Sequence, residues 1–116
     1  MNIEFFRDYC LKKPFVTECF PFDDKTLVFK VDSKMFALVD VESFSGINLK
    51  CEPDYAIELR ERFSGVQPGY HMSKTHWNTV STNEDVDDQL LCELIDLSYR
   101  LVYESLTKKR RNELEA

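Results

Sequence analysis

The segment 66–82 contains the side chains of this chain that are best suited to binding chemistry. It holds both histidines, the only tryptophan and a single lysine, and it has no aspartate or glutamate. Aromatic rings stack on flat ligands, imidazoles and amides hydrogen-bond, and a lysine contacts phosphate. The candidate residues for a nucleic-acid or ligand site in this segment are Tyr70, His71, Lys74, His76, Trp77 and Asn78.

Strand geometry limits how these side chains can act together. If residues 76–80 form a strand, His76, Asn78 and Val80 share one face, while Trp77 and Thr79 share the other. His76 and Trp77 then need a β-bulge to lie on one flat binding face. A second interpretation stays open, in which the two large aromatics are core anchors and the histidines and Asn78 satisfy buried backbone groups.

Two further candidates lie in the segment 46–51, where Ile47 and Leu49 alternate with Asn48 and Lys50. This alternation predicts a strand whose polar side chains point away from the core. Asn48 and Lys50 would extend the binding face of the 66–82 hairpin if both lie on the same side of the sheet. The alternative is an ordinary solvated outer face.

The residue patterns of common catalytic and metal sites are missing. The chain has three glycines and neither a G-x-S-x-G nor a Walker-type glycine loop. His71 and His76 stand five apart without a carboxylate or thiolate cluster, and the four cysteines are widely spaced with no C-x-x-C pair. We therefore expect a protein that is not an enzyme, with free thiols, no metal and no cofactor.

The hydrophobic pattern predicts the elements that position these residues. Helices are expected over 2–13, 53–63 and 85–106, and strands over 26–31, 35–40, 46–51, 66–71 and 76–81. Residues 14–24 are expected to be irregular, with Phe15, Phe20 and Phe22 as buried anchors. The order helix, three strands, helix, two strands, helix predicts a single α+β domain over 1–116, with an antiparallel sheet covered by helices on one face. Residues 107–116 form a basic end.

Composition narrows the classes of function. The 116 residues carry a formal charge of −6, no apolar run approaches the roughly 18 residues of a membrane span, and the first ten residues do not resemble a secretory signal. We therefore expect a monomeric cytoplasmic protein with no membrane role. The charge excludes a uniformly basic nucleic-acid footprint, although Lys108–Arg111 is a short basic run.

Several segments resemble the MmcQ/YjbR family: FPF at 20–22, LVFKVDSKMFAL at 27–38, INLKCEP at 47–53 and PGYHMSKTHWNTV at 68–80. The resemblance implies a compact α+β domain of bacterial type, related to the CyaY-like, or frataxin-like, superfamily. Family members are commonly labelled DNA-binding. This chain departs from the usual pattern at Thr75 and Asp23, and both departures lower the local positive charge. Its first helix offers only Glu4 and Asp8, so the iron binding of frataxin-like proteins is not expected.

Two function hypotheses follow. In the first, the chain binds DNA weakly and in a salt-sensitive way through the 66–82 hairpin and the sheet face, with Lys50 and Lys74 on phosphates and Tyr70 or Trp77 stacked on a base. In the second, it is a non-enzymatic protein-interaction or small-molecule-binding module with no DNA role, since a charge of −6 repels a polyanion.

Overall fold

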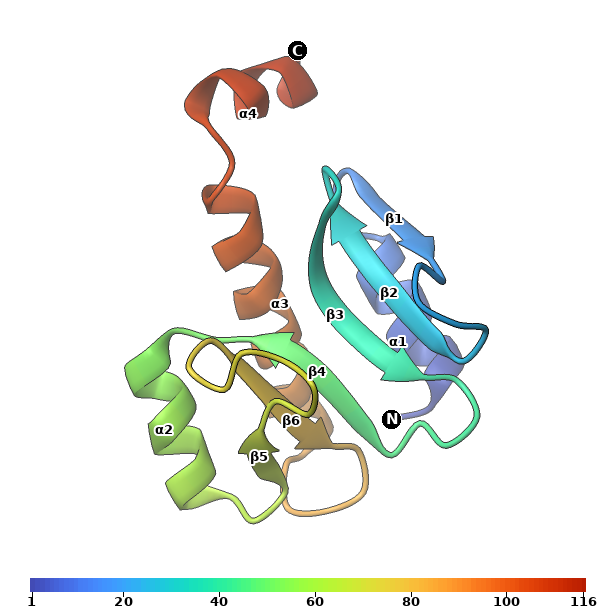
Figure 1. Cartoon of the computed structure of the whole chain (residues 1–116), viewed down its shortest axis with the longest axis vertical. Helices are drawn as coiled ribbons and strands as arrows, with labels where there is room; N and C mark the ends of the chain where they lie inside the picture. Colours follow the sequence, from blue (N-terminus) through green and yellow to red (C-terminus); the bar gives the residue numbers. More distant parts are fainter.

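The computed structural model describes all residues 1–116, arranged as a six-stranded sheet with four helices (Figure 1). The elements in chain order are α1 (Ile3–Leu11), β1 (Val16–Cys19), β2 (Thr26–Val31), β3 (Lys34–Asp40), β4 (Gly46–Lys50), α2 (Pro53–Arg62), β5 (Val66–Pro68), β6 (Trp77–Ser81), α3 (Asp88–Glu104) and α4 (Lys108–Glu115). The predicted α+β fold class is confirmed.

All neighbouring strands pair antiparallel, in the order β1-β2-β3-β4-β6-β5. The register between β4 and β6 places Asn48 opposite Thr79 and Lys50 opposite Trp77. Because side chains alternate along a strand, these four residues lie on one face of the sheet. Asn78 and Val80 lie on the other face.

One face of the sheet is covered by helices, as predicted. Helices α1 and α3 pass behind the sheet in Figure 1, and a cluster of 20 buried residues joins them to the strands. Helix α2 adds Ala56 and Leu59 to this cluster. Each of the larger apolar side chains stabilises the fold by roughly 1.5–3 kcal/mol through burial.

The helices begin at residues that cap their free backbone N–H groups. Asn2 accepts from the Phe5 N–H, and Glu52 caps α2, which has Pro53 in its first position. Helix α3 begins at Asp88, later than predicted, because Asp87 caps it. Asp85, two residues before this cap, instead accepts the backbone N–H groups of Ser64 and Gly65. Residues 85–87 therefore belong to the loop between β6 and α3, which Asp85 joins to the turn between α2 and β5.

The structure adds two elements that the sequence did not predict. Residues 16–19, expected to be irregular, form the edge strand β1, in which Val16 pairs with Val31 and Cys19 with Val28. The basic end forms helix α4, capped by Thr107 and joined to the β2–β3 turn by Arg110 and Asp32. None of the helices combines the length and the hydropathy needed to cross a bilayer.

The open face of the sheet is partly covered by the loop 69–76, drawn in yellow in front of β4 and β6 in Figure 1. Gly69 anchors this loop, since its N–H donates to the Trp77 carbonyl at 2.8 Å. A Cβ at position 69 would stand 2.8 Å from Trp77 Cβ, so only glycine fits this close approach. The predicted strand 66–71 accordingly ends at Pro68.

Candidate functional site

The open face carries a groove with a volume of about 640 Å³, which we call the open-face groove. Three loops form its walls: residues 20–25 between β1 and β2, residues 41–45 between β3 and β4, and the loop 69–76. The lining residues are Phe22, Asp23, Thr26, Leu38, Val39, Asp40, Ser43, Ser45, Gly46, Asn48, Tyr70, His71, Met72 and Thr79.

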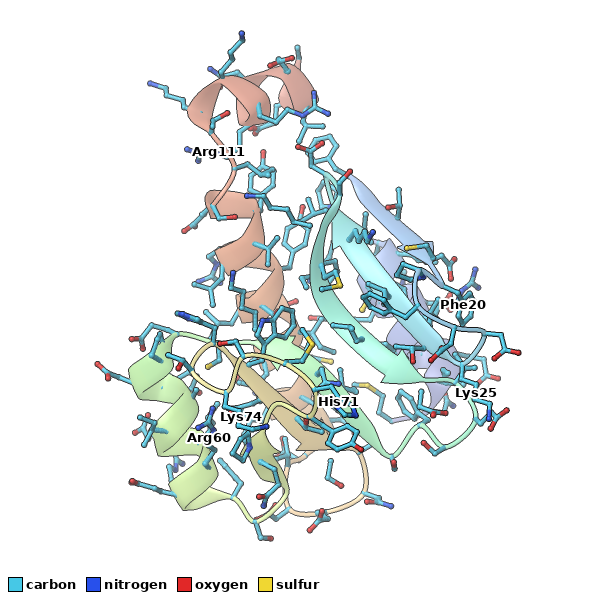
Figure 2. The ribbon with its side chains drawn as sticks, in the orientation of Figure 1. Phe20, Lys25, Arg60, His71, Lys74 and Arg111 are labelled. Atoms are coloured by element: carbon cyan, nitrogen blue, oxygen red, sulfur yellow. The ribbon has the colours of Figure 1, made fainter.

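Two aromatic side chains stand exposed on opposite walls of the groove. Phe22 is 64% exposed and Tyr70 is 69% exposed. The expectation that Phe15, Phe20 and Phe22 are buried anchors is wrong, because all three side chains reach solvent. Figure 2 shows Phe20 and Lys25 on the segment between β1 and β2, apart from His71 on the loop 69–76. Exposed rings on facing walls are suited to holding a flat molecule.

A short chain of hydrogen bonds fixes the polar floor of the groove. The Tyr70 N–H donates to Thr79 Oγ1 at 3.0 Å, and that hydroxyl donates to Asn48 Oδ1 at 2.5 Å. Since Oδ1 of Asn48 is used in this way, its amide nitrogen remains as a free donor in the lining. The floor therefore presents N–H groups to an incoming ligand.

The charged groups of the groove are acidic. Asp23 accepts the N–H groups of Lys25 and Thr26, and these bonds hold the pKa of its carboxyl below the ordinary value. Asp40 Oδ1 likewise accepts the N–H groups of Glu42 and Ser43, which leaves its second oxygen without a hydrogen bond. No lysine or arginine is among the lining residues.

The groove brings together three of the residues predicted from sequence: Asn48, Tyr70 and His71. Tyr70 and His71 are neighbours whose ring centroids lie 4.0 Å apart, and His71 has a left-handed backbone with φ of 58°. This conformation turns the chain sharply at the wall of the groove. The interpretation of Tyr70 as a core anchor is therefore wrong.

Trp77 does not join the groove. Its side chain is only 8% exposed and packs with Val28 and Leu38 beneath the loop 69–76. It lies on the open face of the sheet, but Met72 and the loop cover it. The interpretation of Trp77 as a core anchor is confirmed. Unless the loop 69–76 moves, no nucleobase can stack on the Trp77 ring.

Asn78 lies on the covered face, where it serves the packing of α2. Its amide donates to the Ala56 carbonyl at 3.3 Å and accepts from Arg60 Nε at 2.6 Å. The same guanidinium donates to the carbonyls of Lys74 and Trp77, which ties α2 to the loop 69–76. Figure 2 shows Arg60 beside Lys74 at this junction.

The remaining predicted residues lie outside the groove. Lys74 Nζ donates to the Gly69 carbonyl at 3.2 Å, and its side chain stays at the surface of the loop. His76 is exposed, and its carbonyl accepts the Cys51 N–H. Lys50 is half-buried beside Trp77, so it shares a face with Trp77 and Thr79 rather than with His76 and Asn78.

Sequence reasoning missed the other walls of the groove. Phe22, Asp23 and Asp40 sit at strand ends that lie far apart in the chain but meet at one edge of the groove. The sequence does indicate a turn at Asp23 and at Asp40, because an aspartate side chain often accepts hydrogen bonds from backbone N–H groups two or three residues further along a turn. Asp23 and Asp40 meet because β2 and β3 pair as a hairpin, with Thr26 opposite Asp40. The sequence did not specify the pairing of β4 with β6, which brings the loop 69–76 to the same face.

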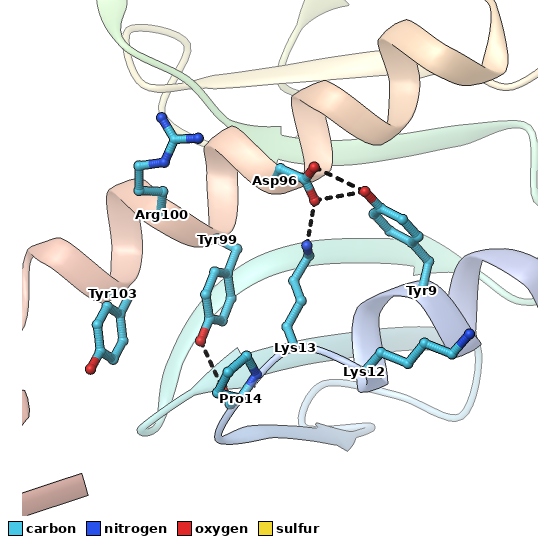
Figure 3. A pocket seen from close by; sticks show the side chains of 8 residues that line it. All are labelled: Tyr9, Lys12, Lys13, Pro14, Asp96, Tyr99, Arg100 and Tyr103. Atoms are coloured by element: carbon cyan, nitrogen blue, oxygen red, sulfur yellow. Dashed lines mark hydrogen bonds and ion pairs between the residues drawn. The ribbon is translucent and has the colours of Figure 1, made fainter. Parts of the chain in front are cut away.

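A second, shallower cleft of about 560 Å³ lies between the end of α1 and the outer side of α3 (Figure 3). Its central polar groups make hydrogen bonds within the cleft: Tyr9 and Lys13 both donate to the Asp96 carboxylate, and Tyr99 donates to the Pro14 carbonyl. Lys12 and Arg100 point away from this cluster. The cleft is thus a contact between helices with little unpaired chemistry to offer.

The thiols are free and mostly sheltered. Cys10 and Cys51 are buried, and burial raises the pKa of the Cys51 thiol to about 11. Cys19 and Cys92 are half-buried. No three His, Cys, Asp or Glu side chains come together in a way that could hold a metal ion.

Comparison with known proteins identifies the family. The YjbR family model matches residues 11–101. The chain belongs to the YjbR family. This confirms the resemblance found in the sequence, and the match ends before α4.

Relatives of the family extend over nearly the whole chain. The uncharacterized protein YjbR of Escherichia coli K12 is 33% identical over 112 residues, which cover 96% of this chain and 95% of the relative. The uncharacterized protein YbdF of Escherichia coli O157:H7 is 37% identical over 100 residues, which cover 85% of this chain and 82% of the relative.

Solved structures share the fold. A crystal structure of a Deinococcus radiodurans protein with a DUF419 domain superposes with a TM-score of 0.93 at 40% identity, covering 98% of this chain and 88% of the other. A Pseudomonas syringae protein superposes with a TM-score of 0.74 at 29% identity, covering 88% of this chain and 99% of the other.

Proposed function

We propose that this protein is a non-enzymatic binding module whose open-face groove takes a small organic ligand. The observation that carries the proposal is the pair of exposed rings, Phe22 and Tyr70, above a floor with an unpaired amide donor at Asn48. Large apolar side chains that gather at a concave surface are typical of binding sites. The volume of about 640 Å³ falls within the range of small-molecule sites.

The rigidity of the groove supports the same function. Its floor consists of β3, β4 and β6 of the sheet, and its third wall is held in place by Gly69 and Arg60. A site on paired strands keeps its geometry before the ligand arrives, which lowers the entropic cost of binding.

The test is a screen of small organic molecules by two-dimensional NMR of the ¹⁵N-labelled protein. We expect a ligand to shift amides of residues 22–26, 38–48 and 70–79 together, and Tyr70→Ala to weaken binding at least tenfold. Phe5→Ala is the matched control, since Phe5 is an exposed ring on α1, away from the groove. Ligands that shift only residues elsewhere, or that bind the Tyr70→Ala protein equally well, would contradict the proposal.

Weak DNA binding through the 66–82 hairpin is a second candidate function. It is favoured by one observation: Tyr70, His71, Lys74 and His76 are all exposed on a single loop. On this hypothesis Tyr70 stacks on a base, while Lys74 contacts a phosphate after leaving the Gly69 carbonyl. Buried Trp77 and the acidic groove confine the contact to the outer rim of the loop.

Fluorescence anisotropy of labelled single-stranded and double-stranded DNA at two salt concentrations tests this second function. Binding should weaken steeply with salt, and Lys74→Glu should abolish it. Lys12→Glu makes the same charge change on the helical side of the molecule and should leave binding nearly intact. Equal losses in the two variants would mean that only the net charge matters, and the hairpin would then not be a site.

A further inference from the structure

The charges in the open-face groove restrict the kind of ligand that fits there. We infer that the groove selects a planar nitrogen heterocycle of neutral or positive charge, of the nucleoside class, and rejects its phosphorylated form. This inference rests on the proposed function and adds the chemical class of the ligand.

The first argument is electrostatic. Asp23 and Asp40 line the groove, and no lysine or arginine side chain joins them. The Asp23 carboxyl stays ionised because two backbone N–H groups stabilise its charge. A phosphate brought beside two carboxylates meets repulsion, and no lysine or arginine of the lining offsets it. Phosphate sites in proteins normally supply arginine, lysine or free backbone N–H groups.

The second argument concerns hydrogen bonds. Asn48 offers a free N–H donor, and Asp40 offers an oxygen that makes no hydrogen bond within the chain. A molecule whose edge carries both an acceptor and a donor satisfies these two groups. Nucleobases carry ring nitrogens or carbonyls beside exocyclic or ring N–H groups, and therefore match this pattern.

The third argument is shape. Phe22 and Tyr70 rise from opposite walls, while half-buried Met72 adds apolar surface to the lining above the buried Leu38. A flat ring stacks well on such side chains, and stacking tolerates different bases because every base has a π-face. Ser45 Oγ donates to Ser43 Oγ at 3.3 Å, so the Ser43 hydroxyl remains as a donor that can contact a sugar.

The test compares nucleosides with their 5′-monophosphates by NMR titration, using adenosine, guanosine and cytidine as probes. We expect at least one nucleoside to shift the groove amides, and its monophosphate to bind roughly tenfold more weakly at low salt. Asp40→Asn keeps an Oδ1 that accepts the Glu42 and Ser43 N–H groups but removes the charge. It should therefore reduce the difference in affinity between nucleoside and monophosphate. Glu42→Gln is the matched control, because Glu42 is an exposed neighbouring acid outside the groove lining.

The outcomes separate the two proposals. Equal affinity for nucleoside and monophosphate, or groove shifts caused only by anionic molecules of the wider screen, would overturn the inference while the binding function stands. A screen in which no molecule of any charge shifts the groove would overturn both. If Asp40→Asn and Glu42→Gln reduce the difference in affinity between nucleoside and monophosphate equally, general surface charge and not the groove causes the difference, which would also overturn the inference.

Discussion

Asn78 is a buried polar side chain in an otherwise apolar layer, and its partners explain its presence. With 2% of its surface exposed, it joins the Ala56 carbonyl to the Arg60 guanidinium. Asn78→Ala would leave the Ala56 carbonyl without this bond and would remove one of the three acceptors of the half-buried Arg60. We expect a loss of about 1–3 kcal/mol in the free energy of unfolding, measured by urea denaturation.

The control for this prediction is Asn112→Ala, which changes an exposed asparagine on α4. Its effect should stay below about 0.5 kcal/mol. If the two variants lose the same stability, the buried Asn78 bonds contribute no more than an exposed asparagine does. A loss accompanied by shifts in residues 69–76 would also show that Arg60 positions the groove wall through this network.

Alternation in the sequence predicted which residues of β6 share a face, and the register confirms it for Asn78 with Val80 and for Trp77 with Thr79. It did not predict which face the helices cover. The usual rule places a tryptophan toward the helices and an asparagine toward solvent. Here Arg60 pairs the asparagine inside, and the loop 69–76 buries the tryptophan outside, so tertiary contacts reverse the rule.

Helix α4 depends on contacts with the rest of the fold. Eight residues rarely form a stable helix alone, and four basic residues in its first turn oppose the helix dipole. Two hydrogen bonds from Arg110 to Asp32, at 2.9 and 2.7 Å, join it to the β2–β3 turn. Asp32→Asn should therefore speed hydrogen exchange in 108–115 while β3 stays protected, as measured by mass spectrometry.

The pH dependence of this anchor follows from the pKa of Asp32, which the Arg110 hydrogen bonds lower. A lowered pKa in the folded state means that the contact is complete above the ordinary aspartate range and is lost as the pH falls through the lowered value. Glu113→Gln is the control, since Glu113 lies 3.7 Å from Arg110 and does not reach the sheet. If hydrogen exchange in 108–115 speeds up in Glu113→Gln but not in Asp32→Asn, the Arg110–Asp32 contact does not anchor the helix.

The helices and strands were predictable where the hydrophobic periodicity was strong. The prediction failed at two short elements, β1 and α4. Strand β1 has four residues between Pro14 and Pro21 and only half-buried apolar contacts, so its pattern resembles a loop. Its pairing with β2 comes from the turn that returns the chain, which alternation in four residues cannot specify. Helix α4 has no apolar stripe, and its contacts with the rest of the fold are polar, from Arg110 to Asp32 and from Tyr103 to Glu115.

At the scale of the whole molecule, contacts between the two ends of the chain hold the domain together. Tyr9 on α1 donates to both carboxylate oxygens of Asp96 on α3, at 2.8 and 2.9 Å, and the terminal amine lies 3.1 Å from Asp88. The main hydrophobic cluster includes residues from Phe6 to Val102. Because both ends share one core, we expect the chain to unfold in one cooperative step.

This arrangement limits stability at alkaline pH. Burial and the bond to Asp96 raise the pKa of Tyr9 well above its ordinary value, and a hydrogen bond to Glu115 raises the pKa of Tyr103 to about 12. Above the ordinary tyrosine pKa of about 10, the unfolded chain loses these protons while the folded chain keeps them. Stability is therefore complete below that pH and falls as the pH rises. Urea denaturation at several pH values from 9 to 11 should show this decline in the free energy of unfolding. The decline with pH should be shallower in Tyr9→Phe. An equal decline in the variant would mean that other groups govern alkaline unfolding.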